Sequence, residues 1–409
     1  MIQKVNYIML AMVVFMGFFM FGISENVKGP AIPRIQLDFK LNEVHLGLLL
    51  ALNSLGYLLA CGYTGWLSRK IGLKFANILC FVAMFVSGFL IYISPNYATF
   101  AASYFLMYIG NGMLEITLGI IAAKVFTKNT GTMMNLSHFF YGLSSTFAPI
   151  VAASIMNANV SGNVIGWRGM YLISLSLSAI PIIPALLSKF PSNSGNGSER
   201  VSIGQYMKQP VAWLIVFILS FGVTAEMAVG GWLVNFLEKS YNFNPALAAG
   251  YMTSFFFCFM LARLLLGPFI DKIGFVKSLL ILSCFAGITI VTGVIIGKPA
   301  AFLLAVSGIG IAPIYPTVMA LLAKLYPENI DTAMTFTLIV MGITIVIGNF
   351  LVGAITDLFK LIFTTAYGAE KGISLGYSAG YMFIGICCLI CFAGTIILLK
   401  RLKKDNKIL

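Results

Sequence analysis

The sequence predicts an all-α polytopic membrane protein with twelve transmembrane helices in two pseudo-symmetric six-helix bundles. The composition is the first observation, because 59% of the 409 residues are hydrophobic and 10% are charged, whereas about a quarter of a soluble domain is charged. The second is that apolar runs long enough to cross a bilayer as helices recur along the whole chain. They are too long for barrel strands and lack a period of two. The third is that the second half repeats features of the first.

Each apolar run predicts one span. The first run is interpreted as a span rather than a signal peptide, because it is long, has no small-residue cleavage site and is followed directly by further spans. The twelve predicted spans are roughly 6–27, 44–66, 74–94, 98–124, 132–156, 168–189, 211–237, 246–268, 275–296, 300–325, 333–358 and 379–400.

The net charge of +13 is distributed as in a membrane protein rather than a nucleic-acid-binding one. With the N-terminus inside, most Lys and Arg residues fall on the cytoplasmic side, as the positive-inside rule requires. We therefore predict a multi-pass protein of the cell inner (cytoplasmic) membrane with both termini cytoplasmic and no nucleic-acid partner. The basic tail anchors this topology and contacts anionic lipid; it contains Lys400, Arg401, Lys403, Lys404 and Lys407.

The sequence contains no pattern that indicates an enzyme. All seven cysteines fall within predicted spans, where they are interpreted as small packing residues rather than disulfide or zinc ligands. There is no GxxxxGK[ST] fingerprint, and no nucleophile stands near a suitable base. The sequence thus predicts no catalytic residue, no cofactor and no metal site, so the energy for any work must come from a gradient or from the substrate itself.

The stretch Phe190–Pro210 is rich in Ser, Gly and Asn and predicts a flexible linker. It divides the chain into an N-terminal bundle (1–190), a cytoplasmic linker (191–209) and a C-terminal bundle with the basic tail (210–409). Three stretches recur in the same order in both bundles. "GWLSRKIGLK" is answered by "GPFIDKIGFVK" at a spacing of 202 residues, "FGISEN" by "FGVTAEM", and Gly110 and Gly112 by Gly308 and Gly310.

These motifs resemble those of the major facilitator superfamily. The loop after the second span fits the superfamily pattern at Gly65, Lys70, Gly72 and Lys74, but Arg69 stands where an Asp is usual, and the second copy keeps the acid as Asp271. A narrower resemblance is to the fucose/galactose/glucose proton symporter branch, which is fucose permease-like. It rests on "GNGMLE" (110–115), "NLSHFFYGLSSTFAP" (135–149), "AEMAVGGWLVNFL" (225–237) and "GIAPIYPT" (310–317). Gly29 stands where fucose permease has an Asp, which weakens the inference that fucose is the substrate.

Four titratable residues inside the spans are candidates for proton coupling. Charges in the bilayer are costly and persist with a partner, a cavity or a proton. Glu115 lies near the middle of its span, where burial favours the neutral acid and suits a reversible proton carrier; a structural carboxylate is the alternative. Glu226 is similar, whereas Glu25 could be a solvated residue at a helix end. His138 could titrate near neutral pH or be a neutral hydrogen-bonded side chain.

An aromatic ring with neighbouring amides is a common means of binding a hexose. Trp232 and Asn235 fit this pattern, although Trp232 could equally belong to the interfacial aromatic belt. Further residues are expected to line a polar substrate cavity: Asn26, Asn53, Asn111, Tyr141, Tyr315 and Asn349. Pro313 and Pro316 are expected to break the tenth span and free carbonyl groups.

A cytoplasmic gate is predicted from the charges of the repeated loops and nearby span ends. The residues are Arg69, Lys70, Arg263, Asp271, Lys272 and Asp357. Arg263 is expected to pair with Asp271 or Asp357. Snorkelling to the headgroups and contact with the substrate are the alternatives.

Taken with the resemblance, these residues predict a monomeric secondary transporter that moves a small neutral solute, a monosaccharide by resemblance, with a proton by alternating access. Two other mechanisms use the same residues. One is proton-coupled efflux of amphipathic drugs or metabolites, and the other is sodium-coupled sugar symport. A membrane enzyme or receptor would need a catalytic constellation or a sensing domain, and the sequence contains neither.

Overall fold

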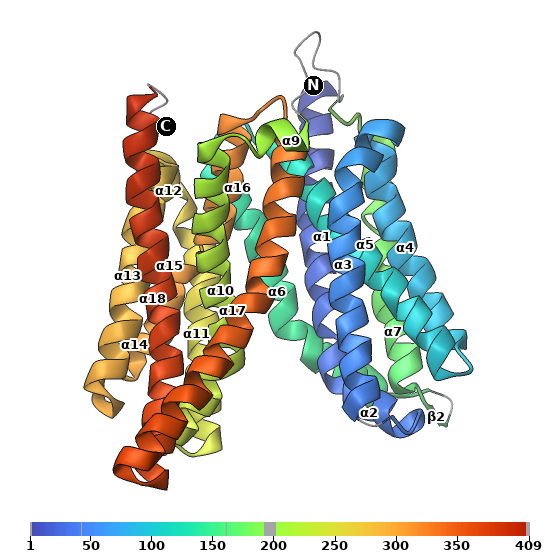
Figure 1. Ribbon diagram of the computed structural model, residues 1–409. Helices are drawn as coiled ribbons and strands as arrows, with labels where there is room; N and C mark the ends of the chain where they lie inside the picture. Colours follow the sequence, from blue (N-terminus) through green and yellow to red (C-terminus); the bar gives the residue numbers. More distant parts are fainter. Residues whose placement is uncertain (1, 42, 161, 192–201, 406–409) are drawn as a thin grey trace. The chain divides into compact units, whose positions relative to one another are not determined.

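The computed structural model describes residues 2–41, 43–160, 162–191 and 202–405, and almost all of them are helical (Figure 1). The chain forms two compact units. Unit 1 comprises residues 1–128, 136–200 and 326–336, and unit 2 comprises residues 129–135, 201–325 and 337–409. Each unit therefore includes the first turn of a long helix whose remainder belongs to the other unit. The predicted boundaries, 1–190 and 210–409 joined by 191–209, remain a prediction, because residues 192–201 lie outside the described part.

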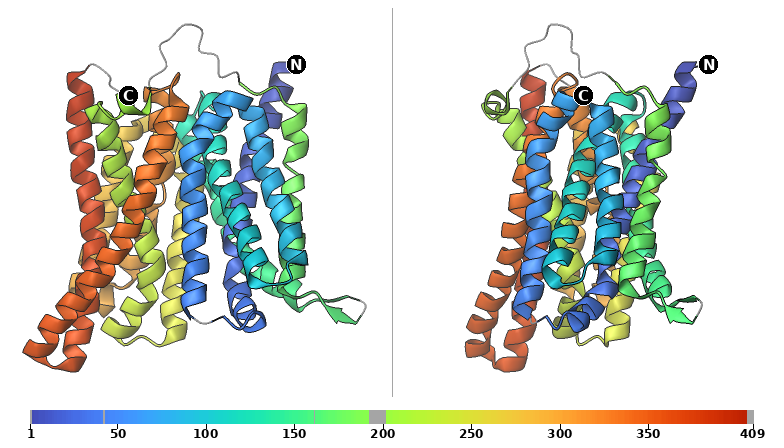
Figure 2. Two further views of the ribbon diagram at one scale, coloured as in Figure 1. Left: turned by 45° about the vertical axis from the view of Figure 1, so that its right-hand side comes forward. Right: turned by 90° about the vertical axis from the view of Figure 1, so that its right-hand side faces the viewer.

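Unit 1 is a bundle of helices with one short hairpin. The two strands of the hairpin, β1 (Asn159–Val160) and β2 (Asn163–Val164), pair antiparallel (Figure 2). The helices are α1 (Ile2–Asn26), α2 (Lys28–Asp38), α3 (Glu43–Ile71), α4 (Leu73–Ile93), α5 (Tyr97–Val125), most of α6 (Thr130–Asn157), α7 (Gly166–Ser176), the 3-10 turn η1 (Leu177–Ala179) and α8 (Ile182–Leu187).

Unit 2 repeats this plan with more interrupted helices. Its helices are α9 (Ile203–Tyr206), α10 (Pro210–Tyr241), α11 (Pro245–Leu265), α12 (Gly267–Ile273), α13 (Phe275–Ile296), the 3-10 turn η2 (Lys298–Ala300), α14 (Phe302–Val306), α15 (Gly308–Ile311), α16 (Ile314–Leu325), most of α17 (Ile330–Tyr367) and α18 (Ala369–Lys404).

The helices confirm the predicted fold class. In the described part of the chain, ten helical stretches are long and apolar enough to cross a membrane, and α11 with α12 forms a further span bent by 54°. Helix α3, with 29 residues, corresponds to the second predicted span and completes the twelve. The predicted span 300–325 is broken after α15, where Pro313 removes a backbone donor.

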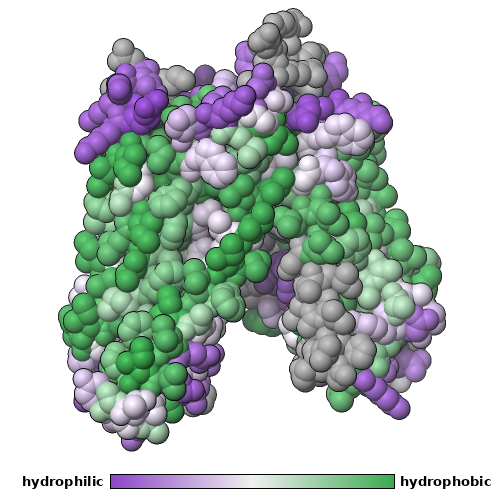
Figure 3. Space-filling model, in the orientation of Figure 1, coloured by the Kyte–Doolittle hydropathy of each residue, from purple (hydrophilic) through white to green (hydrophobic). Residues whose placement is uncertain are grey.

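The surface of unit 2 is suited to lipid. Large apolar side chains are exposed along α17, among them Val346, Phe350 and Leu361. On the face shown in Figure 3, hydrophobic residues cover the middle lengths of the helices. Hydrophilic residues gather near the C-terminal end of α18, whose last turn contains Arg401, Lys403 and Lys404. Such an apolar girdle with charged ends is typical of a bilayer-spanning protein.

The two copies of the repeated loop have the same backbone. Gly72 and Gly274, spaced by 202 residues, precede α4 and α13 with φ angles of 87° and 94°. No atom lies within 4 Å of a Cβ built at Gly72, so glycine is required there for the left-handed backbone and not for space.

Packing revises the register of the fourth-helix echo. A Cβ built at Gly110 would contact Met84 and the carbonyl of Cys80 on α4, and one built at Gly310 would contact Ala286 and the carbonyl of Leu282 on α13. Cys80 and Met84 are spaced from Leu282 and Ala286 by 202 residues. Gly110 therefore corresponds to Gly310 and not to Gly308, so Tyr315 takes the place of Glu115 in unit 2.

Candidate functional site

Glu115 lies inside unit 1, as a polar side chain among apolar helices. Its exposed fraction is 8%, and Tyr57 on α3 donates a hydrogen bond to its carboxylate. The two helices can approach because residue 112 is Gly, where a Cβ would lie 2.6 Å from the carbonyl oxygen of Tyr57. The glycine spacing of the motif thus brings a phenol next to the buried acid.

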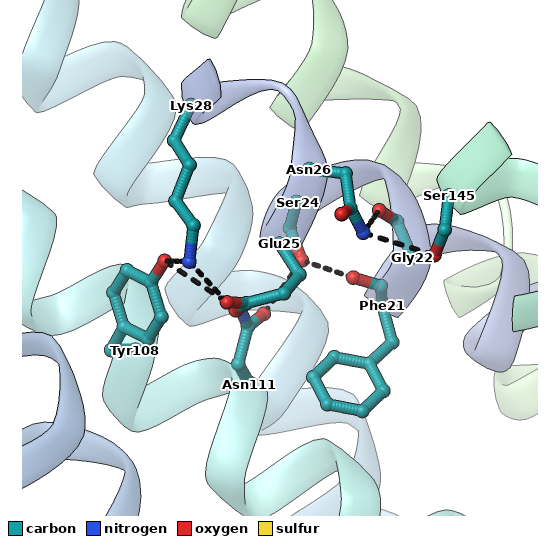
Figure 4. A network of polar contacts seen from close by, with 9 residues as sticks. All are labelled: Phe21, Gly22, Ser24, Glu25, Asn26, Lys28, Tyr108, Asn111 and Ser145. Carbon is teal, nitrogen blue, oxygen red and sulfur yellow. Dashed lines mark hydrogen bonds and ion pairs between the residues drawn. The ribbon is translucent and has the colours of Figure 1, made fainter. Parts of the chain in front are cut away.

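A second polar cluster connects α1, the start of α2 and α5 (Figure 4). The ammonium of Lys28 forms an ion pair with Glu25 and donates to the Tyr108 hydroxyl at 2.9 Å. The side chains of Lys28 and Glu25 are each 27% exposed. Because both charges retain partial contact with the surroundings, the desolvation penalty of this pair is modest.

Amide side chains on α1 and α5 extend this cluster (Figure 4). The Ser24 hydroxyl donates to Asn111 Oδ1 at 2.8 Å, and Asn26 Nδ2 donates to Ser145 Oγ of α6 at 2.9 Å. Among the described residues, the buried Nδ2 of Asn111 has no hydrogen-bond partner. An unpaired buried donor is costly, so Asn111 is suited to donating to a ligand hydroxyl.

His138 and Tyr141 lie on α6 and face the aromatic side of α1. The ring of His138 lies 4.6 Å from that of Phe18, and the ring of Tyr141 lies 5.1 Å from that of Phe21, centroid to centroid. Unit 1 therefore brings together the predicted residues of α1, α5 and α6. The side chain of Asn53 lies outside the described residues.

Unit 2 contains a buried ion pair. Arg263 Nη2 on α11 lies 3.3 Å from Glu226 Oε1 on α10, and the two side chains are 3% and 13% exposed. The predicted pairing of Arg263 with Asp271 or Asp357 was wrong, because its side chain is directed toward the middle of α10. Burying this pair is costly, because both charges lose their hydration.

Two further contacts fix the guanidinium of Arg263. Its Nε donates to the carbonyl of Ala312 at 3.0 Å, and its Cζ lies 4.2 Å from the centre of the Phe259 ring. The carbonyl of Ala312 is available because its helical partner four residues later is Pro316, which has no N–H. The prolines of the tenth span were predicted to free carbonyl groups. Pro316 does so at Ala312, whose carbonyl accepts a hydrogen bond from Arg263.

The remaining predicted substrate residues of unit 2 lie in different surroundings. Trp232 packs against Gly353 of α17, where a Cβ would lie 3.5 Å from the indole. Asn235 is exposed and Tyr315 is 7% exposed. The side chain of Asn349 lies outside the described residues. A site role for these residues remains a prediction.

In each unit, a charged side chain of the repeated loop contacts the N-terminus of a long helix. The loop supplies an acid in unit 2 and a base in unit 1. In unit 2, Asp271 accepts from the backbone N–H groups of Gly131 and Thr132 at 2.7 and 2.8 Å, which is the favoured position for an anion at a helix N-terminus. In unit 1, Arg69 Nη1 lies 3.1 Å from Oδ2 of Asp331, in the first turn of α17. The acid that the first loop lacks is supplied by the helix.

Asp357 does not belong to this group, which corrects the predicted gate. It lies 26 residues after Asp331 on the same helix α17, and the rise per residue separates them by about 39 Å. Lys70 and Lys272 are exposed, and Lys70 lies over the ring of Trp66 at 4.9 Å.

Several partners were missed from the sequence. Asp331 could have been found, because an acid in the first turn of a helix complements the helix dipole. The position of Pro316 four residues after Ala312 was also a usable signal. Tyr57 carried no such signal, since its approach to Glu115 depends on how α3 and α5 cross. No group of three or more metal-ligating side chains occurs among the described residues.

Twelve spanning helices, an internal repeat and charged side chains inside each unit define a polytopic transport protein. The chain belongs to the Major Facilitator Superfamily, whose sequence profile matches residues 14–300 and again 224–408. Members of this family are transporters and not enzymes.

Individual relatives are distant. An uncharacterised transporter of the superfamily from Yersinia pestis is 24% identical over 370 residues, which is 89% of this chain and 93% of that protein. The L-fucose-proton symporter of Escherichia coli is 21% identical over 280 residues, covering 60% and 64% of the two chains.

Solved structures share the fold. The transporter FucP in the outward conformation superimposes with a TM-score of 0.76 at 18% identity, covering 96% of this chain and 99% of that chain. The proton:xylose symporter XylE gives 0.75 at 14% identity, with coverage of 97% and 96%.

Proposed function

We propose that this transporter moves a monosaccharide together with a proton by alternating access. It would work as a monomer in the cytoplasmic membrane, with both termini in the cytoplasm. Glu115 would be the proton-coupling residue, and the polar side chains of α1, α5 and α6 would bind sugar hydroxyl groups.

The burial of Glu115 is the observation that carries this proposal. The Glu115 carboxylate has an exposed fraction of 8% and accepts a hydrogen bond from the phenol of Tyr57. Such a group is stable when protonated and costly when ionised, so gain and loss of a proton would change its hydrogen bonding. The Nδ2 donor of Asn111, one turn before Glu115 on α5, suits a hydroxylated solute.

Two similar proteins support the choice of substrate and ion by their names, an L-fucose-proton symporter and a proton:xylose symporter. Their sequences are distant, so neither sugar is assigned to this chain. Proton-coupled efflux of amphipathic compounds and sodium-coupled sugar uptake use the same acids and remain the competing proposals.

The test is uptake into proteoliposomes that contain the purified chain. A proton gradient, acidic outside, should drive accumulation of a labelled hexose. Glu115→Gln should abolish accumulation, because a neutral amide carries no exchangeable proton, while sugar exchange without a gradient continues. Glu370→Gln, which removes an exposed carboxylate at the start of α18, is the matched control and should accumulate sugar normally.

Three results would contradict the proposed function. Accumulation by Glu115→Gln would show that another group carries the proton. Resistance to amphipathic drugs on expression, without uptake of any hexose, would favour efflux. A dependence on a sodium gradient instead of a proton gradient would favour the third mechanism.

A further inference from the structure

Arg263 presents a problem that transport of a neutral sugar does not explain. The side chain carries a permanent charge, is 3% exposed and lies in the interior of unit 2. Neutral hydroxyl groups can be bound by amides and tyrosines, as in unit 1, without the cost of desolvating a cation. A buried guanidinium in a membrane transporter therefore calls for a ligand of matching charge.

The fold itself does not require a cation at this position. The corresponding residue of unit 1, spaced by 202 residues, is Cys61, whose Sγ lies 3.8 Å from the carbonyl of Gly112. Arg263 makes the corresponding contact with the carbonyl of Ala312. The same crossing of helices is thus compatible with a small neutral side chain, so the charge of Arg263 serves another purpose.

The contacts of Arg263 orient its charged end. The Ala312 carbonyl holds Nε, and the Phe259 ring lies against the guanidinium plane, so Nη2 is directed at Glu226. A guanidinium in a fixed plane matches the two oxygens of a carboxylate. The structure therefore already contains a carboxylate site, occupied by a side chain of the protein.

Glu226 is the more accessible partner, with an exposed fraction of 13%. It can be displaced only if its own negative charge is neutralised, because an unpaired carboxylate inside the unit is costly. We propose that Arg263 binds the carboxylate of an acidic monosaccharide in exchange for Glu226, which takes up a proton as it leaves. This inference rests on the proposed function and narrows its substrate class.

The exchange balances charge and protons. Before binding, Arg263 and Glu226 form a neutral pair. Afterwards the substrate carboxylate pairs with Arg263, and Glu226 carries one proton from the aqueous phase. No covalent bond of the substrate changes. One proton is therefore taken up for each carboxylate bound at this site, in addition to any proton carried by Glu115.

The binding test uses the full chain in lipid nanodiscs and three probes: D-galacturonate, D-galactose and acetate. Galacturonate should bind at least about tenfold more tightly than galactose, since hydrogen bonds to charged groups are worth about 1.5–3 kcal/mol and 1.4 kcal/mol is tenfold. The affinity for galacturonate should fall as the pH rises from acidic to neutral. The affinity for galactose should not depend on pH in this way.

Variants separate the two partners. Arg263→Gln should lose the preference for galacturonate. Glu226→Gln should bind galacturonate with little dependence on pH, because the displaced group no longer needs a proton, and galacturonate should raise its melting temperature more than that of the wild type. Arg168→Gln, which removes a guanidinium paired with Asp38 in unit 1, is the matched control and should keep the wild-type preference.

The outcomes distinguish this inference from the proposed function. Accumulation of galactose with no preference for galacturonate at any pH would overturn the carboxylate site and leave sugar symport in place. Binding of acetate as tightly as galacturonate, lost in Arg263→Gln, would support the carboxylate site and overturn the monosaccharide substrate. Failure of all three probes to bind or accumulate would overturn both. The wild-type pH dependence decides the inference even if Glu226→Gln does not fold.

Discussion

Helix α1 of unit 1 and helix α10 of unit 2 each contain a glutamate paired with a cation, and the two pairs differ in burial. In unit 1, Glu25 and Lys28 are neighbours on consecutive turns and are each 27% exposed. In unit 2, Glu226 pairs across helices with Arg263, at 13% and 3% exposure. The Glu25–Lys28 pair stays partly exposed, so its desolvation costs little. The Glu226–Arg263 pair is mostly buried, so its desolvation costs more.

The difference extends to the helices against which these pairs lie. Packing makes Tyr57 and Glu115 of unit 1 correspond to Phe259 and Tyr315 of unit 2. Unit 1 therefore contains a buried acid held by a phenol, while unit 2 has a buried arginine held by a carbonyl and a ring. The two units share these backbone contacts but differ in charge, so the chemistry of one unit cannot be transferred to the other.

Removal of the cation tests this contrast most strongly. Arg263→Met should destabilise the protein by about 3–5 kcal/mol, because it leaves the carboxylate of Glu226 unpaired in a mostly buried position. Lys28→Met should cost about 0–1 kcal/mol, since Glu25 keeps partial exposure. The measurement is the apparent melting temperature of each variant in the same detergent, with helix content by circular dichroism as a check of folding.

The double variant Arg263→Met with Glu226→Met is the control for this prediction. Removing both charges should restore much of the lost stability, because no unpaired carboxylate remains. Equal losses of stability in Arg263→Met and Lys28→Met would show that burial does not determine how much these ion pairs contribute to stability.

The sequence sufficed for the fold because its signals are local and repeated. Hydropathy located the spans, and the loop glycines at 65, 72, 267 and 274 indicated two units with one plan. The backbone requires glycine at these positions. Gly72 and Gly274 have a positive φ, and Gly65 lies in close contact with Thr335. Such constraints can be inferred without knowing how helices cross.

Partners of the charged residues could not be inferred in the same way. The sequence identified Glu115, Glu226 and Arg263 as unusual because each is charged within an apolar run. It did not reveal that Arg263 reaches Glu226, because that contact depends on the rotation of α10 and α11 about their axes. The assignment of Asp357 to the gate failed for a simpler reason, since most of the length of α17 separates Asp357 from Asp331, the partner of Arg69.

The glycines of the fourth helix offer a second, smaller test of the two units. A Cβ at residue 310 would lie 2.5 Å from the backbone carbonyl of Leu282, whereas one at residue 110 would lie 3.0 Å from the flexible side chain of Met84. Gly310→Ala should therefore cost about 1–3 kcal/mol, and Gly110→Ala should cost less because methionine can adjust. Thermal denaturation of both variants in detergent measures the difference.

A greater loss in Gly110→Ala than in Gly310→Ala would contradict this prediction. It would mean that α4 cannot adapt and that the tighter helix contact lies in unit 1. Gly142→Ala is a matched control, because no atom lies within 4 Å of a Cβ built there, and it should be close to neutral.

The repeated loops give the smallest expected effect and the most specific one. Arg69→Asp places two acids together beside the start of α17, and should lower stability by about 1 kcal/mol, because the pair in the native protein is partly exposed. At the two helix starts, Gly131 and Thr132 of α6 are answered by Asp331 and Thr332 of α17. Adding Asp331→Gly therefore recreates in unit 1 the arrangement of unit 2, in which Asp271 accepts from the backbone and hydroxyl of Thr132. The double variant should recover the loss, as measured by melting temperature and by sugar uptake. If it recovers neither, the two loops do not perform equivalent tasks, and the opposite placement of their acids reflects a difference in function rather than an exchange of charges.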